Sequence, residues 1–255
     1  MKQENLFSIN SLTLEFAIGE QQVIAVNNAT VSIPEKKITI IYGASGSGKS
    51  SLLNVISGLQ QPTKGKLLYR GDNIYNLSSN ELAYFRAHEL GIVYQTNYWV
   101  RSLTVLENVS LPLYFLGYAK ADAHILAQKA LERVGMSKYA SKLPSVLSGG
   151  EQQRIAMARA IASNPPVIIA DEPTGNLDSV NGDMIIDLLR QLNTDESKTV
   201  ILVTHNMEYI SMAHHLLEIH DGQVTEIRNE NIPKTVKTML RDAQKRITTL
   251  METSR

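Results

Sequence analysis

Short apolar runs recur along this chain, and they predict a buried sheet. The runs Ile38–Tyr42, Val167–Ala170 and Thr199–Thr204 are apolar at most positions, and Gly91–Gln95 is a shorter run of the same kind. A strand buried on both faces reads as a continuous apolar run, because neither face meets water. These runs therefore predict the central strands of an α/β fold.

Two further pairs of runs read as antiparallel hairpins. Close to the N-terminus, Leu12–Phe16 and Gln22–Val26 flank a short turn. Close to the other end, Leu216–Ile219 and Gln223–Ile227 flank Asp221-Gly222, a dipeptide that favours a tight hairpin turn. The first hairpin predicts an antiparallel β region beside the central strands.

The middle of the chain changes from strand-like runs to helical periodicity. Thr104 and Glu107 form a capping-box sequence that begins a helix, and Asp122–Val134 has one apolar face. Another helix is expected to begin after Ser148. We therefore expect a helical region, at about residues 103–163, inserted between the strand-rich segments.

A glycine-rich segment, Gly43–Ser50 (GASGSGKS), directly follows the first apolar run and matches G-x-x-x-x-G-K-[ST]. Its three glycines allow a tight turn in which successive backbone N–H groups point toward an anion. Lys49 begins the following helix, and the positive end of the helix dipole adds to the attraction of these N–H groups for an anion. Ser50 has the hydroxyl that ligates Mg²⁺ in such loops. A turn that binds nothing is the alternative. The strand before the loop and the apolar helix after it favour a nucleoside triphosphate site.

Polar residues stand at the ends of three other apolar runs. Asp171 and Glu172 follow a buried strand, where carboxylates are costly unless they hold a cation or act on water. Asp171 fits a Mg²⁺ ligand, and Glu172 fits a general base. His205 follows another core strand, which predicts a place in the same site. Gln95 is open to two interpretations: it faces a metal ion or attacking water, or it hydrogen-bonds a neighbouring loop.

Two candidates are not favoured by the local pattern, namely Phe16 and the segment Ser148-Gly149-Gly150. Phe16 could stack on a purine, but an aromatic residue in a half-buried strand is the more common case. Ser148-Gly149-Gly150 stands at a predicted helix N-terminus, which attracts anions, although Ser-Gly-Gly is also a common helix cap. Taken alone, both are best explained without a ligand.

Composition narrows the class of protein. The 255 residues include 25 Lys and Arg and 25 Asp and Glu, so the formal net charge is zero and nothing indicates attraction to nucleic acid. Cysteine is absent, which excludes disulfides and thiolate chemistry. The sequence shows no signal-peptide core, and no apolar run approaches the roughly 20 residues that span a bilayer. We expect a cytosolic chain that reaches a membrane only through a partner.

Taken in order, these motifs resemble those of the ATP-binding subunit of ABC (ATP-binding-cassette) transporters. The segments that carry the resemblance are Phe16, Gly43–Ser50, Gln95, Leu147–Gln153 (LSGGEQQ), Val167–Glu172 (VIIADE), Gly175–Asp178 (GNLD) and His205. The likeness covers about residues 6–228. The phrases LSGGEQQRIAMARA, ADEPTGNLDS and LTVLENVSLPL are most similar to the lipoprotein-releasing and macrolide-efflux branch, which also includes cell-division ATPases.

The resemblance implies a P-loop NTPase (RecA-like) core with an antiparallel β subdomain and an inserted helical subdomain. It also implies that the chain binds ATP and Mg²⁺ and hydrolyses ATP. Glu172, His205 and Gln95 would be catalytic, and Ser50, Gln95 and Asp171 would hold the metal. The nucleotide would be bound by Phe16, Gly43, Ser45, Gly46, Ser47, Gly48, Lys49, Ser50, Ser51, Ser148, Gly149, Gly150 and Asp178.

Individual roles follow from the resemblance as well. Phe16 would be the platform for adenine, Gln95 would sense Mg²⁺ and water, and His205 would hold the γ-phosphate and water. The Ser148–Gly150 segment would bind the γ-phosphate of the ATP held by a second copy of the chain, and Asp178 would cross the interface. Two ATP molecules would then lie between two head-to-tail copies.

Partners are implied in the same way. The resemblance predicts a homodimer bound to integral membrane permease subunits at the inner face of the cell membrane, with no nucleic acid. One alternative is an ABC ATPase that transmits force without transport, as in cell division, or that acts away from membranes. Another is a module that binds ATP without hydrolysing it, which would predict the loss of Glu172 or His205; both residues are present.

Two segments lie outside these motifs. Tyr98, Trp99 and Arg101 precede the helical region, and we expect either a surface for the membrane partner or, for Trp99, packing inside the helical region. Beyond the ATPase domain, expected at residues 1–228, residues 229–255 predict a C-terminal helical extension. Its apolar residues recur at spacings of three and four, which predicts a helix from about Pro233 to Met251 that packs on its own or its sister cassette.

Overall fold

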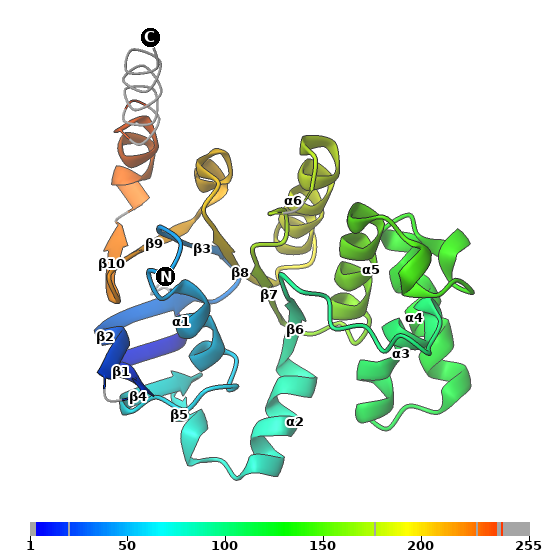
Figure 1. The fold of residues 1–255 in the computed structure, drawn as a ribbon, viewed down its shortest axis with the longest axis horizontal. Helices are drawn as coiled ribbons and strands as arrows, with labels where there is room; N and C mark the ends of the chain where they lie inside the picture. The colour runs from blue at the N-terminus through cyan, green and yellow to red at the C-terminus, as the bar shows by residue number, and fades with distance from the viewer. Residues whose placement is uncertain (1–3, 20, 176, 228, 239–240, 242–255) are drawn as a thin grey trace.

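A six-stranded sheet with the order β10-β9-β3-β8-β7-β6 forms the centre of the fold (Figure 1). The computed structural model describes residues 4–19, 21–175, 177–227, 229–238 and 241. The central strands are β3 (Ile38–Tyr42), β6 (Leu90–Val93), β7 (Val167–Asp171), β8 (Thr199–Thr204), β9 (His215–His220) and β10 (Gln223–Ile227). All neighbours pair in parallel except β9 and β10, which are antiparallel. The predicted central strands and the C-terminal hairpin are confirmed.

An antiparallel sheet with the order β2-β1-β4-β5 lies beside the central sheet. Its strands are β1 (Asn5–Ile18), β2 (Gln21–Pro34), β4 (Lys64–Tyr69) and β5 (Asp72–Asn73). The predicted N-terminal hairpin is confirmed, but its strands are much longer than expected. Several register shifts interrupt the pairing of β1 with β2, for example between Ile9 and Leu12. Because each shift breaks the alternation of buried and exposed residues, the pattern shows only the end of the hairpin near its turn.

Helices connect the strands and cover the sheet. They are α1 (Lys49–Ile56), α2 (Ser79–Glu89), α3 (Val105–Phe115), α4 (Lys120–Arg133), α5 (Gly149–Ile161) and α6 (Ser179–Thr194), with short 3₁₀ segments between some of them. The capping box predicted at Thr104 is present, and Ser148 caps α5 in the same way. Helix α6 begins at Ser179, because the Asp178 carboxylate accepts the backbone N–H of Asn181 and so caps the helix.

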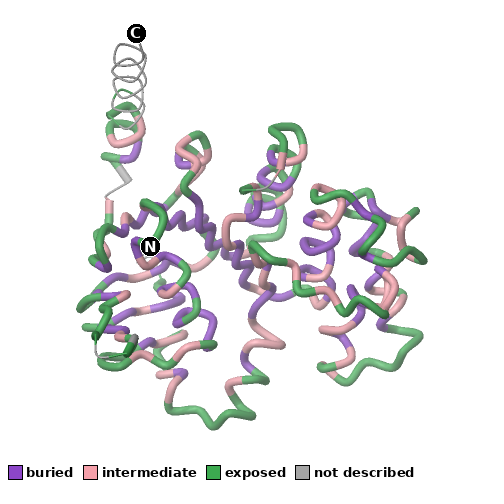
Figure 2. Tube along the Cα trace, viewed as in Figure 1, coloured by how far each residue is buried: buried purple, intermediate pink, exposed green. Residues whose placement is uncertain are grey.

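Strands β3, β7 and β8 of the central sheet are buried on both faces, which accounts for their continuous apolar runs (Figure 2). Ile40 and Leu202 pack in one cluster with residues of α3, α4, α5 and α6. Ile41 and Ile201 point the other way, into a second cluster with residues of α1 and β1. Since β3, β7 and β8 run in parallel, their carboxyl ends lie at one edge of the sheet, and the loops that follow them meet there.

The region at about residues 103–163 is helical, and α3, α4 and α5 pack on one another. Helix α5 also packs on β6, so the region is joined to the central sheet through that helix. Its independence as a subdomain stays a prediction.

The described part of the C-terminal extension begins with a short 3₁₀ turn, Asn229–Asn231, followed by helical residues 232–238 and 241. Ile232 is buried, and Val236 packs against the same core cluster as α5 and α6. The rest of the helix expected up to Met251 lies outside the described residues. Within the described part of the chain, no helix has both the length and the apolar character needed to cross a membrane.

Candidate nucleotide-binding site

The glycine-rich loop joins the end of β3 to the start of α1, and its glycines are required by close backbone contacts. A Cβ on Gly48, where φ is +108°, would lie 2.1 Å from the carbonyl oxygen of Ala25. A Cβ on Gly43 would lie 2.2 Å from the carbonyl oxygen of Ile219. Gly46 also has a positive φ of +77°, and the space where its Cβ would point is open. The loop is therefore pressed against β2 and β9 while one side of it stays open.

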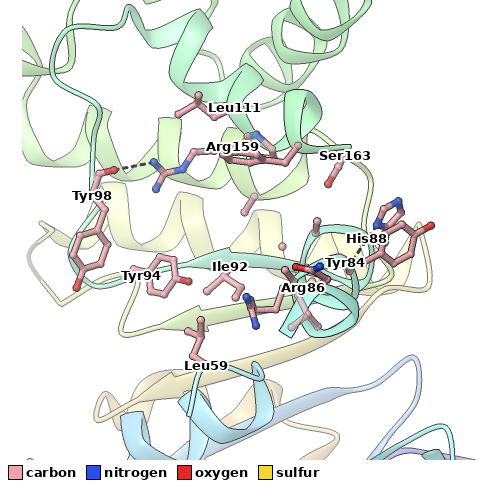
Figure 3. Close-up of a pocket in the computed structure, with 18 residues that line it drawn as sticks. Leu59, Tyr84, Arg86, His88, Ile92, Tyr94, Tyr98, Leu111, Arg159 and Ser163 are labelled. Carbon is pink, nitrogen blue, oxygen red and sulfur yellow. Dashed lines mark hydrogen bonds between the residues drawn. The ribbon is translucent and has the colours of Figure 1, made fainter. Parts of the chain in front are cut away.

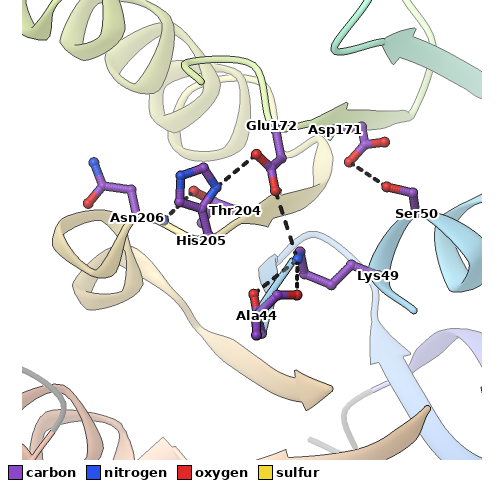
Figure 4. Close-up of polar contacts among 9 residues, drawn as sticks. Ala44, Lys49, Ser50, Asp171, Glu172, Thr204, His205 and Asn206 are labelled. Atoms are coloured by element: carbon purple, nitrogen blue, oxygen red, sulfur yellow. Dashed lines mark hydrogen bonds and ion pairs between the residues drawn. The ribbon is translucent and has the colours of Figure 1, made fainter. Parts of the chain in front are cut away.

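Lys49 is buried at the mouth of this loop (Figure 4). Its Nζ donates hydrogen bonds to the carbonyl oxygens of Gly43, at 2.9 Å, and Ala44, at 2.8 Å. The same Nζ lies 3.9 Å from Oε1 of Glu172. The Lys49 ammonium thus lies between the loop and the Glu172 carboxylate, in a position to bind an anion.

Asp171, the last residue of β7, lies beside the first turn of α1 (Figure 4). The Ser50 hydroxyl donates a hydrogen bond to its Oδ1 at 3.4 Å. Burial raises the pKa of Asp171, while the Ser50 hydrogen bond and the charge of Lys49 act in the opposite direction. A hydroxyl and a partly buried carboxylate are hard oxygen donors, and a bound cation would relieve the desolvation of the carboxylate. These residues fit Mg²⁺.

Glu172 has an unusual backbone conformation, with φ of +45°. A non-glycine residue in this left-handed region costs about 1–2 kcal/mol, and such strain tends to occur at functional sites. Its Oε2 lies 2.8 Å from Nδ1 of His205, which stands exposed at the tip of β8. The Glu172 carboxylate is thus held between His205 on one side and Lys49 on the other (Figure 4).

An open cavity of about 610 Å³ lies in front of the loop. The predicted residues that line it are Phe16, Ser45, Gly46, Ser47, Gly48, Lys49, Ser50, Ser51, Gln95 and Glu172. Gly43 and Asp171 do not line it but bond to Lys49 and Ser50, respectively. His205 lines a smaller neighbouring cavity that Glu172 shares.

The cavity has features that suit a nucleotide. The hydroxyl of Ser47 is buried and lacks a hydrogen-bond partner among the described residues, so a phosphate oxygen would satisfy it. Phe16, on β1 opposite Val23, lies on the wall of the cavity with 37% of its surface exposed. Hydrogen-bond donors and a positive charge at the loop, with an apolar ring on the rim, match the two ends of ATP.

Sequence reasoning missed the contribution of the β9–β10 turn. Asp221 and Gly222 line the cavity, and the backbone N–H of Gly222 donates to the carbonyl oxygen of Ser47 at 3.0 Å. The carbonyl of Gly222 in turn accepts the N–H of Asn27 at 2.8 Å. The sequence marks this dipeptide as a hairpin turn, and no local signal shows that it supports a loop from the other end of the chain.

Besides Gly43, four predicted ATP-binding residues lie outside this cavity. Ser148 and Gly149 are exposed at the start of α5, with Gly150 next to them, and Asp178 is exposed at the start of α6. The Ser148 hydroxyl is engaged in a capping box with Glu151. The single chain therefore gathers the residues around Gly43–Ser50 and leaves these four facing solvent.

A second hollow, of about 750 Å³, lies between α2 and β6 on one side and α3 and α5 on the other (Figure 3). Tyr84, Tyr98 and Phe115 line it and are between 65% and 81% exposed. Arg86 and Arg159 also line it, and none of the described residues in its wall is acidic. We call this hollow the α2–α5 groove.

Trp99 is half-buried and packs against α5 of the helical region, as one of its two interpretations predicts. The guanidinium of Arg159 lies 4.5 Å from the centre of its ring, and its Nε1 donates to Oε1 of Gln152 at 2.9 Å. Its neighbour Tyr98 instead lines the α2–α5 groove (Figure 3). Arg101 is exposed and is not among the residues that line the groove.

Comparisons with known proteins point to one family. Residues 26–175 match the family described as "ABC transporter". The chain is 42% identical over 212 residues to the uncharacterized ABC transporter ATP-binding protein MJ1508 of Methanocaldococcus jannaschii, covering 83% of this chain and 94% of that protein. It is 37% identical over 221 residues to the ABC transporter ATP-binding protein YtrE of Bacillus subtilis, covering 85% and 96%.

Solved structures agree with the sequence comparisons. The "Dimeric Structure of MJ0796, a Bacterial ABC Transporter Cassette" is 37% identical, with a TM-score of 0.83, covering 88% of this chain and 98% of that one. A second structure of that cassette, described as a post-hydrolysis state bound to ADP and Pi, is 36% identical with the same TM-score and coverage. The predicted family and fold class are confirmed. This chain belongs to the ABC transporter family, as an ATP-binding cassette and an ATPase.

Proposed function

We propose that this cassette works as a head-to-tail dimer, which closes on two ATP molecules, opens after hydrolysis and passes this motion to membrane permease subunits. The observation that carries the proposal is the separation of two groups of residues. One group forms the cavity around Gly43–Ser50, and the other is exposed at Ser148–Gly150 and Asp178. A second copy facing the first would bring each exposed group to the other copy's cavity. That a related cassette forms a dimer supports this arrangement.

The residues of one cavity would bind and orient ATP. Bound Mg²⁺-ATP supplies the phosphoryl group that is transferred and a metal that spreads its charge. Lys49 and the loop N–H groups would hold the β- and γ-phosphates, while Ser50, Asp171 and Gln95 would hold the metal. Phe16 would stack on the adenine. A bound phosphate would neutralise the Lys49 ammonium in place of Glu172, which lies 3.9 Å from it. The Glu172 carboxylate would then be available to hydrogen-bond the attacking water.

Glu172 would act as the general base, and His205 would hold it in position. Glu172 would accept the proton of the attacking water, because its carboxylate stands at the cavity wall beside Lys49. The His205 imidazole, 2.8 Å from Oε2, would fix the orientation of that carboxylate. In the closed dimer, Ser148 and Gly150 of the second copy would bind the γ-phosphate from the opposite side and exclude solvent.

The α2–α5 groove would receive the membrane partner. Its exposed aromatic residues are of the kind enriched at binding hot spots. Residues of the core strand β6 and of the helical region both line it, so a bound partner would contact both. A short apolar helix of the permease that carries an acidic residue would match both its surface and its arginines. The cassette would then sit at the inner face of the membrane. The same dimer would serve a permease that moves a substrate or a membrane protein that only transmits force.

The dimer and the partner can be tested on the same variant. Glu172→Gln should form an ATP-dependent dimer by light scattering, whereas Glu172→Gln combined with Lys49→Ala should stay monomeric. The Glu172→Gln cassette, expressed in its own cells and purified with ATP from solubilised membranes, should retain an integral membrane protein by mass spectrometry. If Glu172→Gln stayed monomeric in the presence of ATP, the proposed dimer would be refuted. If the dimer purified from membranes without an integral membrane protein, the proposed permease partner would be refuted.

A further inference from the structure

The first turn of α6 contacts the N-terminus of α5 through Asn181. A Cβ placed on Gly150 would lie 2.9 Å from Cγ of Asn181, 3.1 Å from its Nδ2 and 3.2 Å from its Oδ1. Because all three amide atoms are at nearly equal distance from this point, the flat amide faces the backbone of Gly150. The N-terminal segment of α5, at Gly150, therefore packs against the Asn181 side chain of α6.

Asn181 also holds both carboxylate oxygens of Asp178. Its backbone N–H donates to Oδ1 at 2.8 Å, and its Nδ2 donates to Oδ2 at 2.8 Å. These two hydrogen bonds hold the pKa of Asp178 below its usual range, so the carboxylate stays ionised. One residue thus touches both groups that the single chain leaves exposed, the Ser148–Gly150 segment and Asp178.

The next residue of the same turn faces the catalytic side of its own chain. A Cβ on Gly182, which is buried, would lie 3.1 Å from the Tyr209 hydroxyl and 3.6 Å from Cβ of Thr174. Tyr209 belongs to the 3₁₀ segment Met207–Met212, which begins two residues after His205. The start of α6 therefore lies between the exposed groups and the 3₁₀ segment that follows His205.

We propose that Asn181 is a positioning residue that fixes the Ser148–Gly150 segment and Asp178 relative to each other, so that both engage the partner copy's ATP together. This inference rests on the proposed dimer. The two groups are on different helices, and without a link each would have to be ordered separately when the dimer closes. Such ordering has an entropic cost that a pre-formed contact removes. Asn181 touches no reacting atom in this role.

The test compares ATP-driven dimerisation of Glu172→Gln with and without Asn181→Ala. The added change should raise the ATP concentration needed for dimerisation about fivefold to tenfold, the size expected for loss of a cap-type contact. ATP binding to the monomer, measured with Lys49 intact and at a protein concentration below dimerisation, should not change. Equal dimerisation curves would overturn the proposal.

A matched control separates positioning from general stability. Glu81 stands at the third position of α2 and bonds to its cap, Ser78, as Asn181 bonds to Asp178. Glu81→Ala should lower the thermal midpoint by a similar amount and leave dimerisation unchanged. If both variants weakened dimerisation in proportion to their loss of stability, Asn181 would be a helix cap only and the proposal would fail.

A double-mutant cycle completes the test. If Asn181 acts by holding Asp178, the pair Asp178→Ala and Asn181→Ala should weaken dimerisation little more than the stronger single change. Fully multiplicative effects would overturn the inference. Failure of the Glu172→Gln parent to dimerise would overturn the proposed dimer, whereas a dimerising parent that is insensitive to Asn181→Ala would overturn this inference alone.

Discussion

The two groups of predicted ATP-binding residues are built in opposite ways. The residues around Gly43–Ser50 stand at the ends of buried strands and contact one another within one chain, as in the hydrogen bonds of Lys49 and the pairing of Glu172 with His205. The Ser148–Gly150 segment and Asp178 lie at exposed helix starts. The first group lines one cavity of the single chain, while the second lies outside it. This difference is the basis of our proposal that a second copy completes the site.

The largest expected effect concerns the chemistry of the first group. Glu172→Gln should lower ATP turnover by about 10²–10⁴-fold, the range for loss of a general base, while ATP binding is kept. Because both groups would still hold ATP, the variant should collect as an ATP-bound dimer. Steady-state turnover and size-exclusion chromatography check this. If the variant kept a turnover close to that of the parent, Glu172 would not be the general base.

The next effect separates binding from dimer formation. Lys49→Ala removes a charged hydrogen-bond donor and should weaken ATP binding to the monomer about tenfold to a hundredfold. Ser148→Arg, placed in the Glu172→Gln background, should leave that binding unchanged but prevent dimerisation, because the new side chain would fill the space for the partner's ATP. Fluorescent-ATP titration and light scattering measure the two properties. A loss of monomer binding in Ser148→Arg would contradict the separation of the two groups.

Sequence reasoning identified the first group from local patterns. A phosphate loop behind a strand, a carboxylate pair after a strand and a histidine after a third strand each have a local chemical explanation, and parallel strands bring such ends together. The second group has no such explanation. Ser148-Gly149-Gly150 reads as an ordinary cap, which it also is in the structure. Phe16 lines the cavity with the first group but likewise reads as an ordinary strand residue. Their proposed roles came from the family resemblance, because each depends on a molecule outside the single chain.

Other features could not be predicted because they depend on tertiary contacts. The register shifts in β1 and β2 hid the length of the N-terminal strands. The support that Gly222 gives to the loop at Ser47 joins opposite ends of the sequence.

A smaller effect is expected at the α2–α5 groove. Tyr98→Ala with Arg101→Ala should leave the ATPase of the isolated cassette unchanged but reduce its stimulation by the membrane partner about tenfold, the loss expected for one hot-spot side chain of about 1–2 kcal/mol. Tyr98 lines the groove and Arg101 does not, so Tyr98→Ala alone should account for most of the effect. Unchanged stimulation and complex assembly in both variants would place the partner elsewhere.

The smallest effect is on stability and depends on pH. Burial raises the pKa of the Asp171 carboxyl in the folded chain, so the folded state holds this proton more tightly than the unfolded state does. Ionisation of Asp171 therefore reduces folding stability as pH rises from the pKa of the unfolded chain, about 3.9, through the raised pKa of the folded chain. The Asp171→Asn variant cannot ionise at this position and so lacks this loss of stability. Its thermal midpoint should match the parent near pH 4 and exceed it at pH 7 by a few degrees, with about 2–4 °C for each kcal/mol.

The control for this prediction is Asp72→Asn, which removes an exposed carboxylate on β5. It should show the same midpoint as the parent at both pH values. Asp171→Asn should also lose the stabilisation that Mg²⁺ adds in the presence of ATP. A midpoint below the parent at pH 7 would show that Asp171 is stabilising when ionised, contrary to its burial.

The central claim, that each ATP site is shared between two copies, is tested most directly by mixing two inactive variants. One chain carries Lys49→Ala and the other carries Ser148→Arg, both in the Glu172→Gln background. Each variant is prepared in two batches, one with the donor and one with the acceptor fluorophore of a pair. In a head-to-tail dimer, one of the two sites would combine an intact loop with an intact Ser148–Gly150 segment. The account predicts ATP-dependent energy transfer in the mixture and none for either variant with itself. If the mixture showed no transfer while two Glu172→Gln chains did, the sites would not be shared.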